Sequence, residues 1–458
     1  MNKKAIGFYL LIIIAAIFYI FTSEPVSEEL TPKAENEALN IQEWKTKNNV
    51  RVLYVNAPEL PMLDVQVVFD AGSVRNGEQP GLASLTNSML SHGAKMGNET
   101  LSIDDITERF DSVGARFGTG ASRDNAEISL RTLTDESWLV KSLTTMQAVI
   151  NQPTFDEKEL ERVRKQRLIS FESRKQSPST IANEAFYKTL YKEHPYALPG
   201  IGTEESIKNI TRNDLIDFYK KYYVAKNALV TIVGSINKEK AAAIAEQLVG
   251  KLPQGEKSSV LPEVSMLAEA QAKHFEFPSS QTHILMGQPG IHRTDEDYFT
   301  LYVANHILGG SGFGSRIMKE IREKRGLAYS SYSYFVPLLK PGPFLMGMQT
   351  SNNQTEEAKK VLKQTLADFI EQGPTEKELT HAKKNITGGF PLRIDSNGDI
   401  SNYLAVIGFY QLPLSYLSDF NQRIDKITTA QIKEAMQRRI DPEKMVTITV
   451  GSKVADKS

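Results

Sequence analysis

The chain has 458 residues, which is too long for one ordinary hydrophobic core and indicates two or more domains. Apolar residues make up 40% and charged residues 24%, which is typical of a globular protein and excludes a disordered chain or a multi-spanning membrane protein. The 54 basic and 55 acidic residues nearly cancel, so a general binder of nucleic acid is not expected. The lack of cysteine excludes disulfides, thiolate zinc sites, iron–sulfur clusters and cysteine nucleophiles.

An apolar run from Ala5 to Phe21 follows the first four residues. It has about 17 residues, the lower limit for a membrane-spanning helix. Phe21 and Thr22 stand where a cleavable signal peptide would carry small residues. We therefore expect residues 1–22 to be an uncleaved signal-anchor, with cleavage after Ser23 as the alternative.

The charges around this run predict its orientation in a membrane. Lys3 and Lys4 precede it and should remain in the cytoplasm, since positive flanks stay on that side. The bulk of the chain is then expected on the extracytoplasmic side, in a bacterial periplasm. Residues 23–40 are acidic and contain proline, as expected of a tether.

Strand and helix patterns alternate from Trp44 onwards. Alternating or continuous β-branched apolar residues predict strands, and apolar residues at helical spacing predict helices. The expected strands are residues 50–55, 63–69, 126–133 and 229–233. The expected helices are residues 81–90, 103–113, 136–149, a long stretch after residue 156, and 214–223.

Two motifs from the first half of the chain recur in the second half. The run Glu157–Leu160 returns at Glu376–Leu379, and the strand motif that begins at Val230 returns at Val446. The two offsets are nearly equal, which chance rarely produces over such distances and which predicts an internal repeat. We therefore expect two homologous α+β domains.

The expected domain boundaries follow from the repeat. The first domain would span residues 41–250 and the second residues 273–454, joined by a linker at 251–272 that contains proline, glycine and serine. A threonine opens the helix before each repeated strand motif, as expected of an N-cap. These threonines are Thr211, and Thr428 or Thr429.

Three blocks of the sequence carry a family resemblance: residues 81–90, residues 194–207, and residues 308–330, which include IREKRGLAYS. They resemble the pitrilysin / mitochondrial processing peptidase family of inverzincin-type zinc peptidases, and the likeness covers nearly all of residues 44–452. The resemblance implies two domains, each a mostly antiparallel sheet packed with helices. Together they would form half of a clamshell chamber for unfolded peptides.

Catalysis in that family needs H-x-x-E-H on a helix, where two histidines bind zinc and the glutamate activates water. A glutamate farther along the chain completes the coordination. The aligned residues here are Ser84 and Ser88 for the histidines, Asn87 for the base and Ser170 for the distal glutamate. Serine is a poor zinc ligand, and an amide cannot accept the proton of water. The seven histidines are scattered singly, so we expect no metal in this chain and no zinc hydrolysis by it alone.

The Arg–Tyr pair of the family is retained as Arg322 and Tyr329. In active members, the resemblance implies, this pair reaches toward the zinc centre and hydrogen-bonds the substrate backbone and the oxyanion formed by water attack. The alternative is that Arg322 pairs with a neighbouring acid such as Glu320 or Glu323.

Residues 121–130 resemble the family's edge strand, onto which a substrate strand adds by backbone pairing. The candidate substrate-binding residues in this stretch are Ser122, Arg123, Asn125 and Ala126. An ordinary edge strand kept soluble by its charges is an equal alternative.

The glycine-rich run at residues 309–314 lacks the Lys-Ser/Thr pair of a phosphate-binding loop. The resemblance implies that a loop here touches substrate on non-catalytic subunits, which makes Gly309, Gly310 and Gly312 candidates. A flexible connector explains the run equally well. The tyrosines of residues 329–335 alternate roughly with period two, which predicts a half-buried strand whose faces the sequence does not assign.

Together these features predict a membrane-anchored, non-catalytic, substrate-binding subunit of a heterodimeric zinc metallopeptidase that degrades peptides or unfolded proteins. A homologous partner with H-x-x-E-H would hold the zinc, and Arg322 and Tyr329 would complete its site. Two alternatives stay open: a non-proteolytic scaffold or assembly subunit, and a peptide-binding holdase with the same fold.

Overall fold

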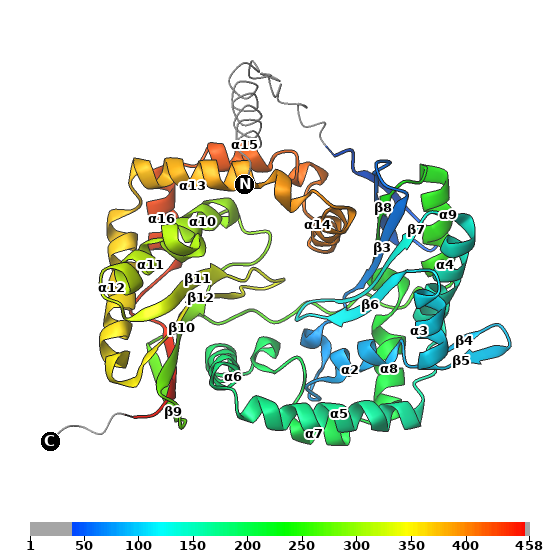
Figure 1. Cartoon of the computed structure of the whole chain (residues 1–458), viewed down its shortest axis with the longest axis horizontal. Helices are drawn as coiled ribbons and strands as arrows, with labels where there is room; N and C mark the ends of the chain where they lie inside the picture. The colour runs from blue at the N-terminus through cyan, green and yellow to red at the C-terminus, as the bar shows by residue number, and fades with distance from the viewer. Residues whose placement is uncertain (1–38, 454–458) are drawn as a thin grey trace, which may run out of the picture. The chain divides into compact units, whose positions relative to one another are not determined.

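The computed structural model describes residues 39–453 of the chain (Figure 1). The signal-anchor predicted at residues 1–22 and nearly all of the tether at 23–40 lie outside the described residues. Between residues 39 and 453, no helix is both long enough and apolar enough to cross a membrane.

The first sheet has six strands in the spatial order β1-β2-β8-β3-β7-β6. They are β1 (Gln42–Lys45), β2 (Arg51–Asn56), β3 (Met62–Phe69), β6 (Arg116–Ala121), β7 (Ala126–Leu133) and β8 (Ala228–Gly234). β2 and β8 pair in parallel, and all other neighbours pair antiparallel. β2, β3 and β8 are buried along nearly their whole length, as expected of central strands covered on both faces.

The second sheet has five strands in the order β11-β12-β10-β13-β9. They are β9 (Gln271–Glu276), β10 (Gln281–Pro289), β11 (Ala328–Phe335), β12 (Pro343–Ser351) and β13 (Val446–Gly451). β13 and β9 are parallel and the other pairs are antiparallel. From β9 to β11 this sheet repeats the order and directions of β2-β8-β3-β7-β6. The prediction of an α+β fold with mostly antiparallel sheets is confirmed.

The described part of the chain also contains fifteen α-helices, a small hairpin and several short 3₁₀- and π-helical turns. The hairpin is β4 (Ala94–Met96) with β5 (Glu99–Leu101). The helices before the linker are α2 (Leu82–Met89), α3 (Ile103–Asp111), α4 (Glu136–Asn151), α5 (Glu157–Lys175), α6 (Pro178–Tyr191), α7 (Glu204–Asn209), α8 (Arg212–Tyr222) and α9 (Lys238–Val249). Those after it are α10 (Tyr298–Asn305), α11 (Arg316–Met318), α12 (Thr355–Gln372), α13 (Glu376–Gly389), α14 (Asn397–Phe409), α15 (Phe420–Asp425) and α16 (Thr429–Arg439).

The helix starts follow local capping chemistry. Thr211 and Thr428 each accept a hydrogen bond from a first-turn backbone N–H, and the third helical residue bonds back to the cap. Such a capping box satisfies two backbone donors that a helix start otherwise leaves free. The predicted threonine N-caps are therefore confirmed, with Thr428 as the second one.

Each half of the chain lends one helix to the sheet of the other half (Figure 1). α6 packs on β10 and β13 of the second sheet, while α14 packs on β3 and β8 of the first. Phe186 of α6 is fully buried in a cluster with Leu345 and Ile448. Under α14, the Thr231 and Ser401 hydroxyls lie 3.0 Å apart and hydrogen-bond. The two halves are thus interlocked by reciprocal packing.

Candidate functional site

Helix α2 carries three of the four positions where zinc chemistry would be expected. Gly81 caps the helix with φ +92°, where a Cβ would lie 2.8 Å from the Ile201 carbonyl oxygen. Ser84 sits at the first histidine position. Its hydroxyl donates to the Gly81 carbonyl at 3.1 Å and accepts from Nη1 of Arg167 at 2.9 Å. The hydroxyl therefore already donates one hydrogen bond and accepts another within the chain.

Asn87 occupies the position of the general base and is 1% exposed. Its Nδ2 donates to the Tyr223 hydroxyl at 3.1 Å and to the Glu127 carbonyl at 3.3 Å. Burial raises the pKa of Tyr223 above its ordinary value, so this phenol stays neutral. Asn87 therefore links neighbouring elements in the core by donating two hydrogen bonds. An ionised carboxylate at this position has no hydrogen to donate and could not form them.

Ser88 and Ser170 complete the predicted set, and the contacts of both are with residues three or four positions away in the chain. The Ser88 carbonyl lies 2.8 Å from Nδ1 of His92, and the Ser170 hydroxyl donates to the Arg167 carbonyl at 2.7 Å. Within residues 39–453, no group of three or more acidic or histidine side chains is arranged to hold a metal ion. The side chains at these four positions therefore do not fit a zinc ion.

Arg322 and Tyr329 lie together at the surface. Nη1 of Arg322 donates to the Tyr329 carbonyl at 3.2 Å, and its guanidinium lies 4.3 Å from the Tyr329 ring centroid and 4.6 Å from that of Phe313. Tyr329 is 80% exposed and Phe313 is 65% exposed. The pair is thus brought together, with its guanidinium held between two exposed rings.

The alternative pairing of Arg322 with Glu320 or Glu323 is wrong, because Arg322 forms no ion pair with either residue. Glu320 instead forms ion pairs with Lys324 and Arg325, both at 2.7 Å. Gly326 ends this helical segment with φ +62°, and its N–H donates to the Arg322 carbonyl. The turn at Gly326 is what returns the chain so that Tyr329 lies beside Arg322.

Two family models match the chain. One, described as "Insulinase (Peptidase family M16)", matches residues 51–204, and the other, "Peptidase M16 inactive domain", matches residues 209–386. A crystal structure of the peptidase M16 inactive domain from Pseudomonas fluorescens is 40% identical, with a TM-score of 0.87, over 92% of this chain and 99% of that one. The chain belongs to the M16 peptidase family. The recognition from the three sequence blocks is confirmed.

Among other M16 relatives, some are named as proteases and others as non-peptidase homologues. A "Non-peptidase homolog YmxG" from Helicobacter pylori is 26% identical over 89% of this chain and 93% of that protein. An "Uncharacterized zinc protease" from Rickettsia bellii is 27% identical over 82% of this chain and 90% of that protein. The inactive-domain match and the residues on α2 fit a non-catalytic member of the M16 family.

The predicted edge strand of this M16 chain requires a correction. Ser122, Arg123 and Asn125 form the turn between β6 and β7, and Ala126 opens β7, which lies between β3 and β6. The edge is β6, where Gly118 and Gly120 interrupt the apolar alternation that identifies a strand. The predicted stretch therefore covers a turn and an interior strand.

Arg123 is half-buried, and its guanidinium contacts other residues of the chain. Its guanidinium lies 3.7 Å from the Tyr187 ring centroid, and Nη1 donates to the Tyr196 carbonyl at 3.1 Å. In contrast, Ser122 and Asn125 are close to solvent and bond to each other across the turn, with the Ser122 N–H donating to the Asn125 carbonyl at 2.8 Å. Of these three residues, Arg123 is therefore the one whose side chain holds other parts of the chain together.

Asp124, within the same turn, was expected from the sequence to be one of the charges that keep an exposed edge strand soluble, and this expectation is wrong. Asp124 is 0% exposed and accepts from the Tyr196 hydroxyl at 3.0 Å, the Tyr410 hydroxyl at 2.9 Å and the Leu339 N–H at 2.7 Å. Burial raises the pKa of this carboxyl above its ordinary value. Its partners come from both halves of the chain, so Asp124 joins them.

Of the three candidate glycines in the glycine run of this M16 chain, Gly309 and Gly310 are restricted by packing and Gly312 lies in a left-handed turn. A Cβ on Gly309 would overlap Ser333 of β11, and one on Gly310 would lie 2.7 Å from Nδ2 of Asn305. Gly312 has φ +61° and open space around it. Gly309 is buried, whereas Gly310 and Gly312, next to the exposed Phe313, are open to solvent and accessible to a ligand.

The outward face of β11 carries the tyrosines that the sequence left unassigned. Tyr329, Tyr332 and Tyr334 are exposed, while Ser331 and Ser333 between them are buried. The rings of Tyr332 and Tyr334 stack with centroids 5.6 Å apart. This aromatic stripe continues from the Arg322–Tyr329 pair along an edge strand of the second sheet.

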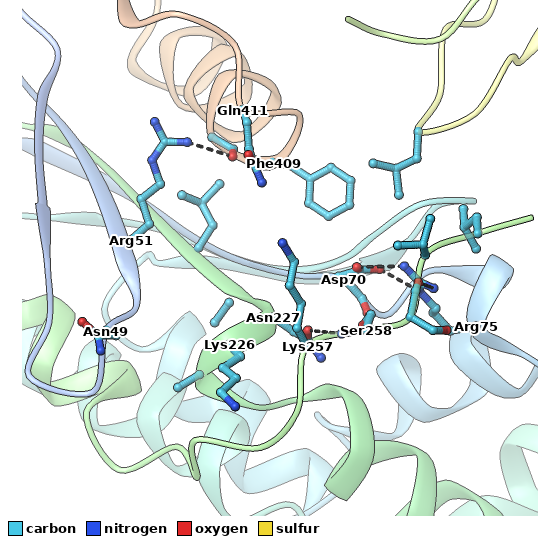
Figure 2. A pocket seen from close by; sticks show the side chains of 18 of the residues that line it. Asn49, Arg51, Asp70, Arg75, Lys226, Asn227, Lys257, Ser258, Phe409 and Gln411 are labelled. Atoms are coloured by element: carbon cyan, nitrogen blue, oxygen red, sulfur yellow. Dashed lines mark hydrogen bonds and ion pairs between the residues drawn. The ribbon is translucent and has the colours of Figure 1, made fainter.

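A cavity of about 740 Å³ lies between β1, β8, the linker and the end of α14 (Figure 2). Arg75 bonds Asp70 through two nitrogens at 2.8 Å, and Arg51 donates to the Gly408 carbonyl at 3.1 Å. The cavity contains none of the predicted site residues. Its basic lining residues outnumber the acidic Glu43 and Asp70, and they are Lys45, Arg51, Arg75, Lys226, Lys257 and Lys340.

Proposed function

We propose that this chain is the non-catalytic, substrate-binding subunit of a two-chain M16 zinc peptidase that degrades peptides or unfolded proteins. The observation that carries the proposal is the Arg322–Tyr329 pair at the surface. It stands on a chain whose zinc-ligand and general-base positions are occupied by Ser84, Ser88 and Asn87. A chain with oxyanion donors and no metal centre could take part in catalysis if a second chain supplied the metal.

The chemistry of the pair supports a role in trans. Arg322 forms no ion pair with an acid in the described part of the chain, so its guanidinium fork remains available to a developing negative charge. The exposed Tyr329 phenol supplies a second donor. Two such donors would stabilise the oxyanion formed when zinc-bound water on the partner attacks a peptide carbonyl, and removing one donor typically costs about 2.7–4 kcal/mol of barrier.

Substrate would bind in an extended conformation. β6 is an edge strand with free backbone groups on one side, and such an edge can pair with an added strand. The Tyr332–Tyr334 stack would offer a surface to apolar side chains of an unfolded polypeptide. Because these contacts do not read sequence closely, the proposal specifies unfolded chains as a class of substrate.

The location of the complex is part of the same proposal. Residues 1–22 would anchor the chain in the membrane, and residues 23–40 would connect the anchor to the folded part in the periplasm. Zinc would be held only by the homologous partner, which carries H-x-x-E-H.

Co-expression with an M16 chain that carries H-x-x-E-H tests this function. The two chains should co-purify, contain zinc only when the partner is present, and cleave a quenched-fluorescence peptide that neither chain cleaves alone. Removal of zinc with a chelator should abolish the cleavage. Equal cleavage by the partner alone would instead favour a scaffold, and peptide binding by this chain as a homodimer without any partner would favour a holdase.

A further inference from the structure

The guanidinium of Arg167 lies at the first of the degenerate zinc positions. Arg167 comes from α5, and its Nη1 and Nη2 donate at 2.9 Å to the hydroxyl and the carbonyl oxygen of Ser84 on α2. Nη1 also lies 3.4 Å from the Ile201 carbonyl oxygen. One side chain therefore links α5, α2 and the loop around Ile201.

The acceptors around this guanidinium are all neutral. They are one hydroxyl and two carbonyl oxygens, and Arg167 has no ion pair among residues 39–453. Burial lowers the pKa of Arg167 to about 10, so the side chain still carries its charge at neutral pH. Burial is the main cause that lowers the pKa of nearby His92, and the positive charges of Arg162 and Arg167 lower it further.

We infer that Arg167 has taken the place of the metal as the cation of this site. In a zinc-binding member, the ion would join α2 to the distal ligand on α5, at the position of Ser170. Here a guanidinium makes the same link from α5 to α2, through hydrogen bonds instead of coordination. This inference concerns the chain itself and holds whether or not the proposed partner exists.

A fixed positive charge has a consequence for metal binding. A divalent ion placed next to Ser84 would be repelled by the guanidinium in surroundings where burial weakens screening. Returning ligands to α2 should therefore not be enough to restore a zinc site. The positive charge of Arg167 must be removed as well.

The test uses the full chain with histidines at both helix positions, Ser84→His with Ser88→His, which places two imidazoles one helical turn apart. Zinc content after equilibrium dialysis and the shift of Tm with zinc are compared with Arg167 intact and with Arg167→Met added. We expect the Arg167→Met version to bind zinc at least about tenfold more tightly, because repulsion is relieved.

Arg164 provides the matched control. It lies one turn earlier on α5 and donates to the backbone carbonyls of Ile207 and Ile210. Arg164→Met therefore removes a similar set of hydrogen bonds but leaves the positive charge beside Ser84 in place. Arg167→Gln, which keeps a donor and loses the charge, serves if Arg167→Met does not fold. Equal zinc affinity with Arg167 intact and replaced, or an equal gain from Arg164→Met, overturns the inference.

Discussion

Asp124 illustrates how a single buried residue holds the two halves of this M16 chain together. Its carboxyl is the shared acceptor of two tyrosine hydroxyls and one backbone N–H. Asp124→Ala would leave these donors buried without a partner, which should lower the free energy of unfolding by about 3 kcal/mol. Urea denaturation measures this loss, and a change below about 0.5 kcal/mol would show that water replaces the carboxyl.

The pH dependence of stability should also report on Asp124. Because burial raises the pKa of its carboxyl, the folded chain binds this proton more tightly than the unfolded chain. The resulting stabilisation is complete below the unfolded pKa of about 4 and is lost as pH rises through the folded value. Thermal melts between about pH 4 and 7 should therefore show wild type losing stability relative to Asp124→Asn. A constant difference between the two would contradict the assignment.

At the residue scale, the sequence could place candidate residues where they belong to a continuous motif. Ser84, Asn87 and Ser88 could be placed because they stand at the aligned positions of the H-x-x-E-H motif on one helix. Arg322 and Tyr329 could be placed because they belong to one continuous block. Arg167 and Asp124 could not be identified in this way. Their partners are distant in sequence and meet them only in the folded chain.

At the scale of elements, strands with a clear alternation were predicted with accurate boundaries. The expected strand at residues 126–133 is β7 itself, whereas its neighbour β6 was missed because its glycines break the pattern. The sequence also did not predict that α6 and α14 each pack on the sheet of the other half of the chain. A helical pattern predicts a helix and its buried face, but does not say which sheet that face covers.

The junction between the π-helical turn at His306–Gly310 and β11 depends on a glycine. Gly309→Ala should lower the free energy of unfolding by about 1–3 kcal/mol, because its Cβ would overlap Ser333. Gly388, inside α13 with no atom within 4 Å of a built Cβ, is the control, and Gly388→Ala should be neutral or stabilise by up to about 1 kcal/mol. Equal effects in chemical denaturation would mean that the close approach to β11 does not restrict position 309.

For the described molecule as a whole, the exchange of α6 and α14 predicts cooperative folding. Residues 41–270 alone would leave the β3–β8 face without α14, and residues 271–453 alone would leave β10 and β13 without α6. Each fragment should therefore aggregate or bind a hydrophobic dye, and mixing the two should restore a compact species. Two independent thermal transitions, with each fragment stable alone, would contradict this prediction.

The most direct test of the central claim is the turnover number of the two-chain complex with Arg322→Ala. We expect kcat to fall by about 10²–10³-fold, with the amount of assembled complex and the zinc content unchanged. Arg325→Ala is the matched control, since Arg325 is engaged with Glu320 and should leave kcat at the wild-type value. Wild-type turnover in an intact Arg322→Ala complex would contradict a role for this chain in the partner's active site.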